Sequence, residues 1–146
     1  MASRRSAALA LAVLAAAGAA ISIYLTWTKI AGVAPICGPS GGCETVENST
    51  YSSIGGIPVA LFGLGYSAVV LATWLAWWRT DRADLLLIPY VFGLIGTIVE
   101  AYLVFLELFV IHAVCLWCVA YGVTVVLGWV AAVIVLRQAR RSNRQV

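Results

Sequence analysis

The chain has 146 residues, of which 63% are apolar and 10% are charged, and its formal net charge is +3. Soluble domains are roughly 45–50% apolar and about 25% charged, so this composition excludes an ordinary soluble domain and, for most of the chain, intrinsic disorder. The net charge is small, and we expect no nucleic-acid partner. A helical membrane protein fits, because four spans of about 20 residues each fit into this length.

Apolar stretches, each long enough to cross a hydrocarbon core of about 30 Å as a helix, recur along the chain. They lie at residues 7–27, 58–78, 85–109 and 113–136. Backbone groups in lipid must be paired internally, which favours helices, and the alternating pattern of barrel strands is not seen. The predicted fold class is an all-α, integral membrane four-helix bundle that forms a single domain over residues 1–146.

The first stretch also has features of a signal peptide, because Arg4 and Arg5 precede an apolar run. The apolar pattern continues through Leu25, which exceeds the usual apolar core of about 7–15 residues. Trp27 then lies where an interfacial anchor belongs. We therefore interpret this stretch as the first spanning helix.

Basic residues flank the stretches asymmetrically. One side of a four-span arrangement receives Arg4, Arg5, Arg79, Arg82, Arg137, Arg140, Arg141 and Arg144, and only Lys29 falls on the other side. Positive charge marks the cytoplasmic side, so both termini are predicted to be cytoplasmic, with residues 137–146 as a basic tail.

The long connection at residues 28–57 faces outward in this arrangement and is rich in glycine and proline, which mark turns rather than a regular element. A loop of this length is typically functional or disordered. Its apolar side chains, among them Ile36, Val46 and Ile54, predict that it packs down as a cap between helices 1 and 2.

The cysteines form two pairs on the outward side. Cys37 and Cys43 flank a Gly-Pro-Ser-Gly-Gly segment, whose glycines let the sulfurs approach within disulfide range. Cys115 and Cys118 form a Cys-x-x-Cys at the outer end of the fourth span, where they share one helix face and the N-terminus favours the first thiolate. Two pairs on one side allow thiol–disulfide exchange between them.

Two other interpretations of the cysteines stay open. The loop pair can be a simple staple and the second pair two buried apolar side chains. The four cysteines can also ligate zinc, but His112 is the only histidine nearby, and we expect no metal.

Four features in order resemble the vitamin K epoxide reductase family. They are the pair Cys37 and Cys43, Ser49 six residues after the second cysteine, the GIPVALFG segment at 56–63 and the CLWC segment at 115–118. The resemblance covers about residues 7–136. It argues against the DsbB-type oxidases, which place Cys-x-x-Cys in the first outward loop.

The resemblance implies a quinone-dependent thiol–disulfide oxidoreductase in the plasma membrane, with its active site near the outer face. Microbial members take electrons from a thioredoxin-like or DsbA-like partner and pass them to a quinone of the ubiquinone, menaquinone or phylloquinone type. They thereby drive disulfide formation outside the cytoplasm. Many carry a fused thioredoxin-like domain; no such domain follows the fourth span here, so we expect a separate partner protein, beside membrane lipid and quinone.

The resemblance also implies residue roles. Cys37 and Cys43 correspond to the pair that exchanges with the partner, Cys115 to the sulfur that a loop cysteine attacks, and Cys118 to the sulfur closest to the quinone. Ser49 corresponds to a hydroxyl that supports the loop or the thiolate.

The expected quinone-binding residues are Phe62, as an aromatic wall, together with Tyr51, Val59 and Tyr121. Animal members place Asn at the position of Val59 and Tyr at the position of Gly122, whereas Tyr121 points about 100° away on a helix. These departures argue against vitamin K epoxide reduction of the animal type, which stays an alternative. A structural or transport subunit with a stapling disulfide is the alternative from another class.

Polar residues near the spans have simpler expected roles. Glu107 is expected to be solvated near the outer surface, and Glu100, which lies deeper, to make a helix-packing hydrogen bond, with proton delivery to quinone as the alternative. His112 is expected to be an interfacial side chain, with modulation of the Cys115 pKa as the alternative.

Overall fold

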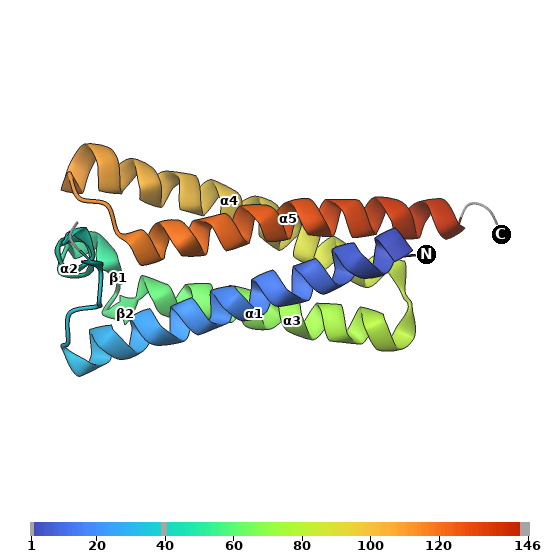
Figure 1. Cartoon of the computed structure of the whole chain (residues 1–146), viewed down its shortest axis with the longest axis horizontal. Helices are drawn as coiled ribbons and strands as arrows, with labels where there is room; N and C mark the ends of the chain where they lie inside the picture. Colours follow the sequence, from blue (N-terminus) through green and yellow to red (C-terminus); the bar gives the residue numbers. More distant parts are fainter. Residues whose placement is uncertain (1, 39–40, 144–146) are drawn as a thin grey trace.

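A computed structural model describes residues 2–38 and 41–143, which form a bundle of long helices with a cap at one end (Figure 1). The long helices are α1 (Ala2–Ala31), α3 (Val59–Thr80), α4 (Leu87–Leu106) and α5 (Leu116–Asn143). Four helical segments in the described part of the chain are long and apolar enough to cross a membrane. The predicted class, an all-α membrane four-helix bundle, is confirmed.

Small side chains let the helices approach one another in the middle of the bundle. The buried residues there are Leu11, Ala15, Val70, Ala131 and Ala132. Alanines on α1 and α5 permit close backbone contact, as is common between membrane helices. Large apolar side chains instead lie exposed along all four long helices, where lipid takes the place of a protein core.

Both termini lie at one end of the bundle, together with the connection between α3 and α4 (Figure 1). The α3 helix ends at Asp81, whose left-handed backbone lets its N–H donate to the Trp77 carbonyl at 2.8 Å. A 3₁₀ turn, η3 (Ala83–Leu86), leads into α4. Arg79 and Arg82 therefore lie at the end that carries the termini, and Lys29, in the last turn of α1, lies at the other.

The connection between α1 and α3 forms the predicted cap, but it contains more regular structure than turns. It holds the short helix α2 (Gly42–Glu47), the 3₁₀ turn η2 (Thr50–Ser52) and the strands β1 (Ser53–Ile54) and β2 (Ile57–Pro58). The strands pair antiparallel across Gly55 and Gly56. Both glycines have positive φ, as the central residues of a two-residue type I′ hairpin turn require.

Hydrogen bonds from the end of α1 hold the cap in place. The Lys29 ammonium donates to the Glu47 carbonyl and to the Ser52 hydroxyl, the latter at 2.9 Å. The Thr28 hydroxyl donates to Glu47 Oε1 at 3.1 Å. Burial raises the pKa of Glu47 above its usual value, and the contacts with Thr28 and Lys29 oppose that shift. The cap is therefore attached to α1 through both the backbone and the side chain of Glu47.

The junction between α4 and α5 is longer than the three residues, 110–112, that separate the predicted stretches 85–109 and 113–136. A π-helical turn, η4 (Glu107–Ile111), follows α4, and His112 then adopts the left-handed conformation at φ 55°. Residues 112–115 have no regular structure, so α5 begins at Leu116 rather than at 113.

The α5 helix also continues to Asn143, beyond the predicted end at 136. Most of the predicted basic tail is therefore helical, and Arg140 and Arg141 lie in its last turn. Arg144 lies outside the described residues.

We expect Gly93→Ala to destabilise the bundle. A Cβ at this position would lie 2.8 Å from Trp129 Cδ1 and 3.0 Å from Trp129 Cβ, so α4 and α5 must separate. Overpacking of this kind costs about 1–3 kcal/mol. Gly65→Ala is the matched control, because nothing lies within 4 Å of a Cβ there, and helical propensity favours alanine. Thermal unfolding in detergent followed by circular dichroism measures both; equal midpoints would contradict the packing argument.

Candidate active site

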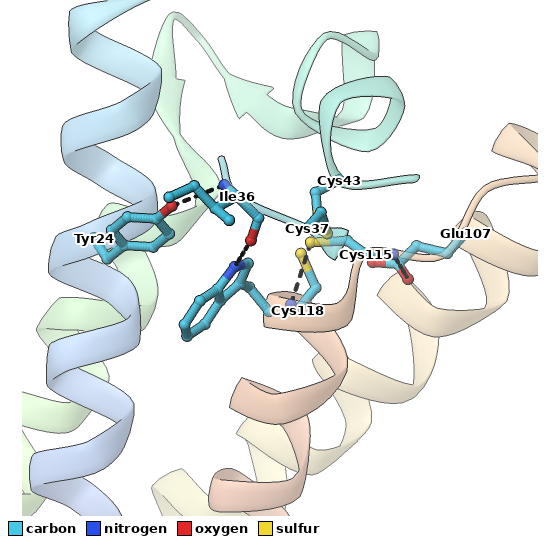
Figure 2. Close-up of a disulfide and its surroundings, with 8 residues drawn as sticks. Tyr24, Ile36, Cys37, Cys43, Glu107, Cys115 and Cys118 are labelled. Carbon is cyan, nitrogen blue, oxygen red and sulfur yellow. Dashed lines mark hydrogen bonds between the residues drawn. A yellow bond between two sulfur atoms is a disulfide. The ribbon is translucent and has the colours of Figure 1, made fainter. Parts of the chain in front are cut away.

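The loop pair and the first cysteine of the second pair form one buried cluster beneath the cap. Cys37 and Cys43 are joined by a disulfide with their Cα atoms 5.9 Å apart, whereas Cys115 and Cys118 are free thiols. The exposed fractions are 8% for Cys37, 0% for Cys43 and 2% for Cys115. Cys118 packs against the same cluster (Figure 2). The four cysteines that the sequence singled out are thus brought together.

Gly42 makes this approach possible. A Cβ on Gly42 would clash with the Val114 carbonyl oxygen, so only glycine lets α2 pack directly on the segment before α5. Cys43 and Cys115 each follow one of these two contacting residues in the chain. The backbone contact therefore places the loop disulfide on Cys115.

Cys115 is the N-cap of α5 rather than a residue on its face. Its sulfur accepts the Cys118 N–H at 3.2 Å, and its carbonyl accepts the Val119 N–H at 3.0 Å, the first bond of the helix. Hydrogen bonds from the Cys118 thiol and backbone lower the pKa of the Cys115 thiol below its usual value, against the opposing effects of burial and Glu107. The helix N-terminus also favours a thiolate at this position. Cys115 is therefore the thiol suited to exchange.

The expectation that Glu107 is solvated was wrong, because the residue is buried. Its exposed fraction is 4%, and its Oε2 accepts the Cys115 N–H at 3.1 Å. The carboxylate and the sulfurs of Cys115 and Cys118 all lie within 4.8 Å of one another. A carboxylate inside an otherwise apolar span was the available signal that Glu107 has a buried role. The sequence did not reveal the π-helical turn that begins at this residue.

His112 lies apart from the sulfurs. Its ring is exposed, and Nδ1 lies 3.2 Å from the Leu108 carbonyl. The side chains that act on the Cys115 pKa are those of Cys118 and Glu107, so the interfacial interpretation of His112 agrees with its position. A zinc site built from all four cysteines does not agree with the pairing of Cys37 and Cys43.

A cavity of about 470 Å³ opens beside this cluster, within the usual range for small-molecule sites. The predicted site residues that line it are Cys43, Ser49, Tyr51, Val59, Phe62, Cys115, Cys118 and Tyr121. Most of the remaining lining is apolar, and half of it comes from α3 and α4. Cys37, by contrast, is not among the lining residues.

Polar groups enter the cavity from the helices. The Tyr121 hydroxyl donates to the Gly63 carbonyl at 2.9 Å, and Tyr66 and Glu100 also line the wall. A Cβ on Gly122 would meet Glu100 Oε2 at 3.0 Å, so the absence of a side chain there leaves room for this carboxylate. The sequence identified Tyr121 as a site residue and Glu100 only as an alternative proton donor to quinone. It gave Tyr66 no place in the site, because a helical position does not tell which neighbouring helix it faces.

The Ser49 hydroxyl makes its hydrogen bond within the cap rather than to a cysteine thiol. Its hydroxyl donates to the Val46 carbonyl at 2.6 Å, and its own carbonyl accepts the Ser52 hydroxyl at 2.8 Å. Both bonds tie the end of α2 to η2, so Ser49 sets the path of the loop along the cavity wall.

Ile36, the residue before Cys37, is held through both its backbone N–H and its carbonyl (Figure 2). The Ile36 N–H donates to the Tyr24 hydroxyl at 2.9 Å, and Trp117 Nε1–H donates to the Ile36 carbonyl at 2.8 Å. The rings of Tyr24 and Trp117 lie 5.0 Å apart. Since Trp117 lies between Cys115 and Cys118, the second pair is linked directly to the loop that carries the first.

The family model described as "Vitamin K epoxide reductase family" matches residues 9–133. This range includes both cysteine pairs and parts of all four long helices. The resemblance inferred from the order of the sequence motifs is therefore confirmed.

We expect Trp117→Phe to make the loop disulfide easier to reduce. The substitution keeps an aromatic ring but removes the hydrogen bond to Ile36, which contributes about 1 kcal/mol, or about fivefold in the opening of the loop. The measurement is the rate at which dithiothreitol reduces Cys37–Cys43, resolved by mass spectrometry. Trp27→Phe, at an exposed position of α1 near the same end, is the control. Equal rates in both variants would show that the bond does not hold the loop.

Proposed function

The chain belongs to the vitamin K epoxide reductase family, whose members are membrane oxidoreductases, and we propose that it passes electrons from a thioredoxin-like partner's dithiol to a quinone. The observation that carries this proposal is the stacking of the Cys37–Cys43 disulfide on Cys115, with Cys118 facing a cavity. One pair thus lies in a loop and the other between that loop and a ligand-sized space.

The partner attacks Cys37. This sulfur is the more exposed member of the loop pair and lies outside the cavity lining, whereas Cys43 is fully buried. A partner thiolate forms a mixed disulfide with Cys37 and releases Cys43 as a thiolate. The leaving sulfur is therefore the one that already faces the second pair.

Cys43 then attacks Cys115 of the oxidised Cys115–Cys118 pair, and Cys118 leaves as a thiolate. The second thiolate of the partner resolves the mixed disulfide and frees Cys37, which attacks Cys43 and releases Cys115. Two electrons have then passed to the second pair, and the partner leaves as a disulfide. These exchanges leave the loop pair as a disulfide and the second pair as two free thiols, which is the state of the cysteines in the structure.

The cavity suits the head group of a quinone, of the ubiquinone, menaquinone or phylloquinone type. Its walls are mainly apolar, with Phe62 and Val59 near the cap, and Tyr121 and Glu100 supply hydrogen-bonding groups. A bound quinone supplies an acceptor for two electrons and two protons. The position of Glu100, against Gly122, supports a role in orienting a carbonyl oxygen and delivering a proton.

The clustering of basic residues at the end opposite the cap supports an orientation. Positive charge is retained in the cytoplasm, so both termini face the cytoplasm and the cysteines lie near the outer face of the plasma membrane. Disulfides persist on that side. The reaction then oxidises protein thiols outside the cytoplasm, through a separate partner.

Cys118→Ser is expected to abolish quinone reduction driven by a thioredoxin-like dithiol in detergent. Removal of this sulfur leaves the second pair unable to form a disulfide, so turnover falls to background. Ser53→Ala, in strand β1 of the cap, is the control and keeps wild-type turnover. If folded wild-type protein reduces none of the three quinone types, the cysteines have a structural role and the proposal fails.

The order of attack predicts which mixed disulfide accumulates. In the double variant Cys37→Ser, Cys118→Ser, oxidation should trap a Cys43–Cys115 bond, because the contact between Gly42 and Val114 brings these two cysteines together and both line the cavity. The matched variant Cys43→Ser, Cys118→Ser should trap much less Cys37–Cys115 bond. Peptide mapping under non-reducing conditions measures both, and the reverse preference would assign the attack to Cys37.

A further inference from the structure

A carboxylate lies buried against the second cysteine pair. Glu107 is 4% exposed, and its described partners are the Cys115 N–H, at 3.1 Å, and the Cys118 thiol. An ionisable group at membrane depth is costly and usually functional. The exchange of disulfides and the capture of quinone, as proposed above, leave this group without a role.

The backbone aims Glu107 at the sulfurs. The π-helical turn η4 begins at this residue, and the Glu107 carbonyl accepts the Ala113 N–H at 3.1 Å. The carboxylate accepts the next bond along the segment, from Cys115. The backbone carbonyl and the side-chain carboxylate of Glu107 therefore both hold the segment that leads into α5. Such π-helical turns are frequent at functional sites.

We propose that Glu107 positions the Cys115–Cys118 pair and accepts the proton of the Cys118 thiol when the pair is oxidised. This inference rests on the proposed transfer of electrons to a quinone. Formation of the Cys115–Cys118 bond releases two electrons and two protons from the dithiol, and a quinone takes up two of each. Glu107 holds the Cys118 proton as a carboxylic acid at the cavity wall, and the Cys115 proton passes to solvent when that sulfur becomes a thiolate. The two protons released by the dithiol balance the two that the quinone takes up.

The geometry favours this division between the two thiols. Cys115 has the N-cap position, and its sulfur accepts the Cys118 N–H; both features stabilise its thiolate. Cys118 lies within the first turn of α5, further from the cap, and its sulfur lies within 4.8 Å of the Glu107 carboxylate. The proton of the Cys118 thiol therefore has the Glu107 carboxylate beside it as an acceptor.

Other titratable groups share the cavity and set the background for any pH dependence. They are Lys29, Glu47, Tyr51, Tyr66, Glu100, Cys115, Cys118 and Tyr121, whereas Cys43 is held in its disulfide. Glu107 acts on Cys115 through its negative charge, which raises the Cys115 pKa. Removal of that charge should therefore lower the Cys115 pKa further.

The test compares Glu107→Gln with wild type in two measurements. In the first, site-resolved alkylation by iodoacetamide is followed against pH, and the midpoint for Cys115 should move to lower pH. In the second, the reduced protein is mixed with a soluble quinone, and the single-turnover rate of Cys115–Cys118 formation should fall about 100-fold, as loss of a general base does. A more reactive thiol with slower oxidation is a combination that structural damage does not produce.

Two further variants complete the design. Glu44→Gln removes an exposed carboxylate from α2 at the same end and should change neither measurement. Glu107→Asp keeps the charge on a shorter side chain, and its oxidation rate should fall between those of wild type and Glu107→Gln. If Glu107→Gln does not fold, a folded Glu107→Asp decides the matter, because an oxidation rate equal to wild type overturns the proposal.

The alkylation measurement needs neither quinone nor partner. An unchanged Cys115 midpoint in Glu107→Gln would overturn the role of Glu107, whatever the turnover of the enzyme. Failure of wild-type protein to reduce any quinone would instead overturn the proposed function. The two failures are therefore distinguishable.

Discussion

The close contact between Gly42 and the Val114 carbonyl determines where the sulfurs lie. It brings α2 onto the segment that leads into α5, so Cys43 and Cys115 face each other although 72 positions separate them in the chain. The anchoring of the cap by Lys29 and Thr28 supports the same contact from α1. A larger residue at position 42 would lift the cap and separate the two redox pairs, whatever the state of the four long helices.

The membrane imposes the second constraint, because it removes water from the surroundings of every polar group in the bundle. Apolar side chains face outward and small ones lie between the helices, which leaves the interior free for a few polar groups. Glu107, Glu100 and Tyr121 all line the same cavity wall. These few polar groups therefore share a cavity whose remaining walls are mainly apolar.

Hydropathy and motif order were sufficient to predict the fold class, the cap and the placement of both cysteine pairs at the same end of the bundle. These features depend on composition along the chain, which a sequence displays directly. The burial of Glu107 was not predicted, because hydropathy placed this residue in solvent near the outer surface, whereas in the structure it begins a π-helical turn and is 4% exposed. The N-cap role of Cys115 was missed for a related reason, because the helix begins later than the apolar stretch. The neighbour of Gly122 could not be read from the sequence, since it belongs to another helix.

The burial of Cys115 beneath the loop disulfide has a consequence for the access of small molecules to the second cysteine pair. A small reductant that approaches from the capped end of the bundle meets the cap before it reaches Cys115. In the proposed reaction the cap therefore limits nonspecific reduction, because a small thiol in solution must displace the cap before its electrons reach the second cysteine pair. A protein donor that binds the cap and opens it would then be favoured over free thiols.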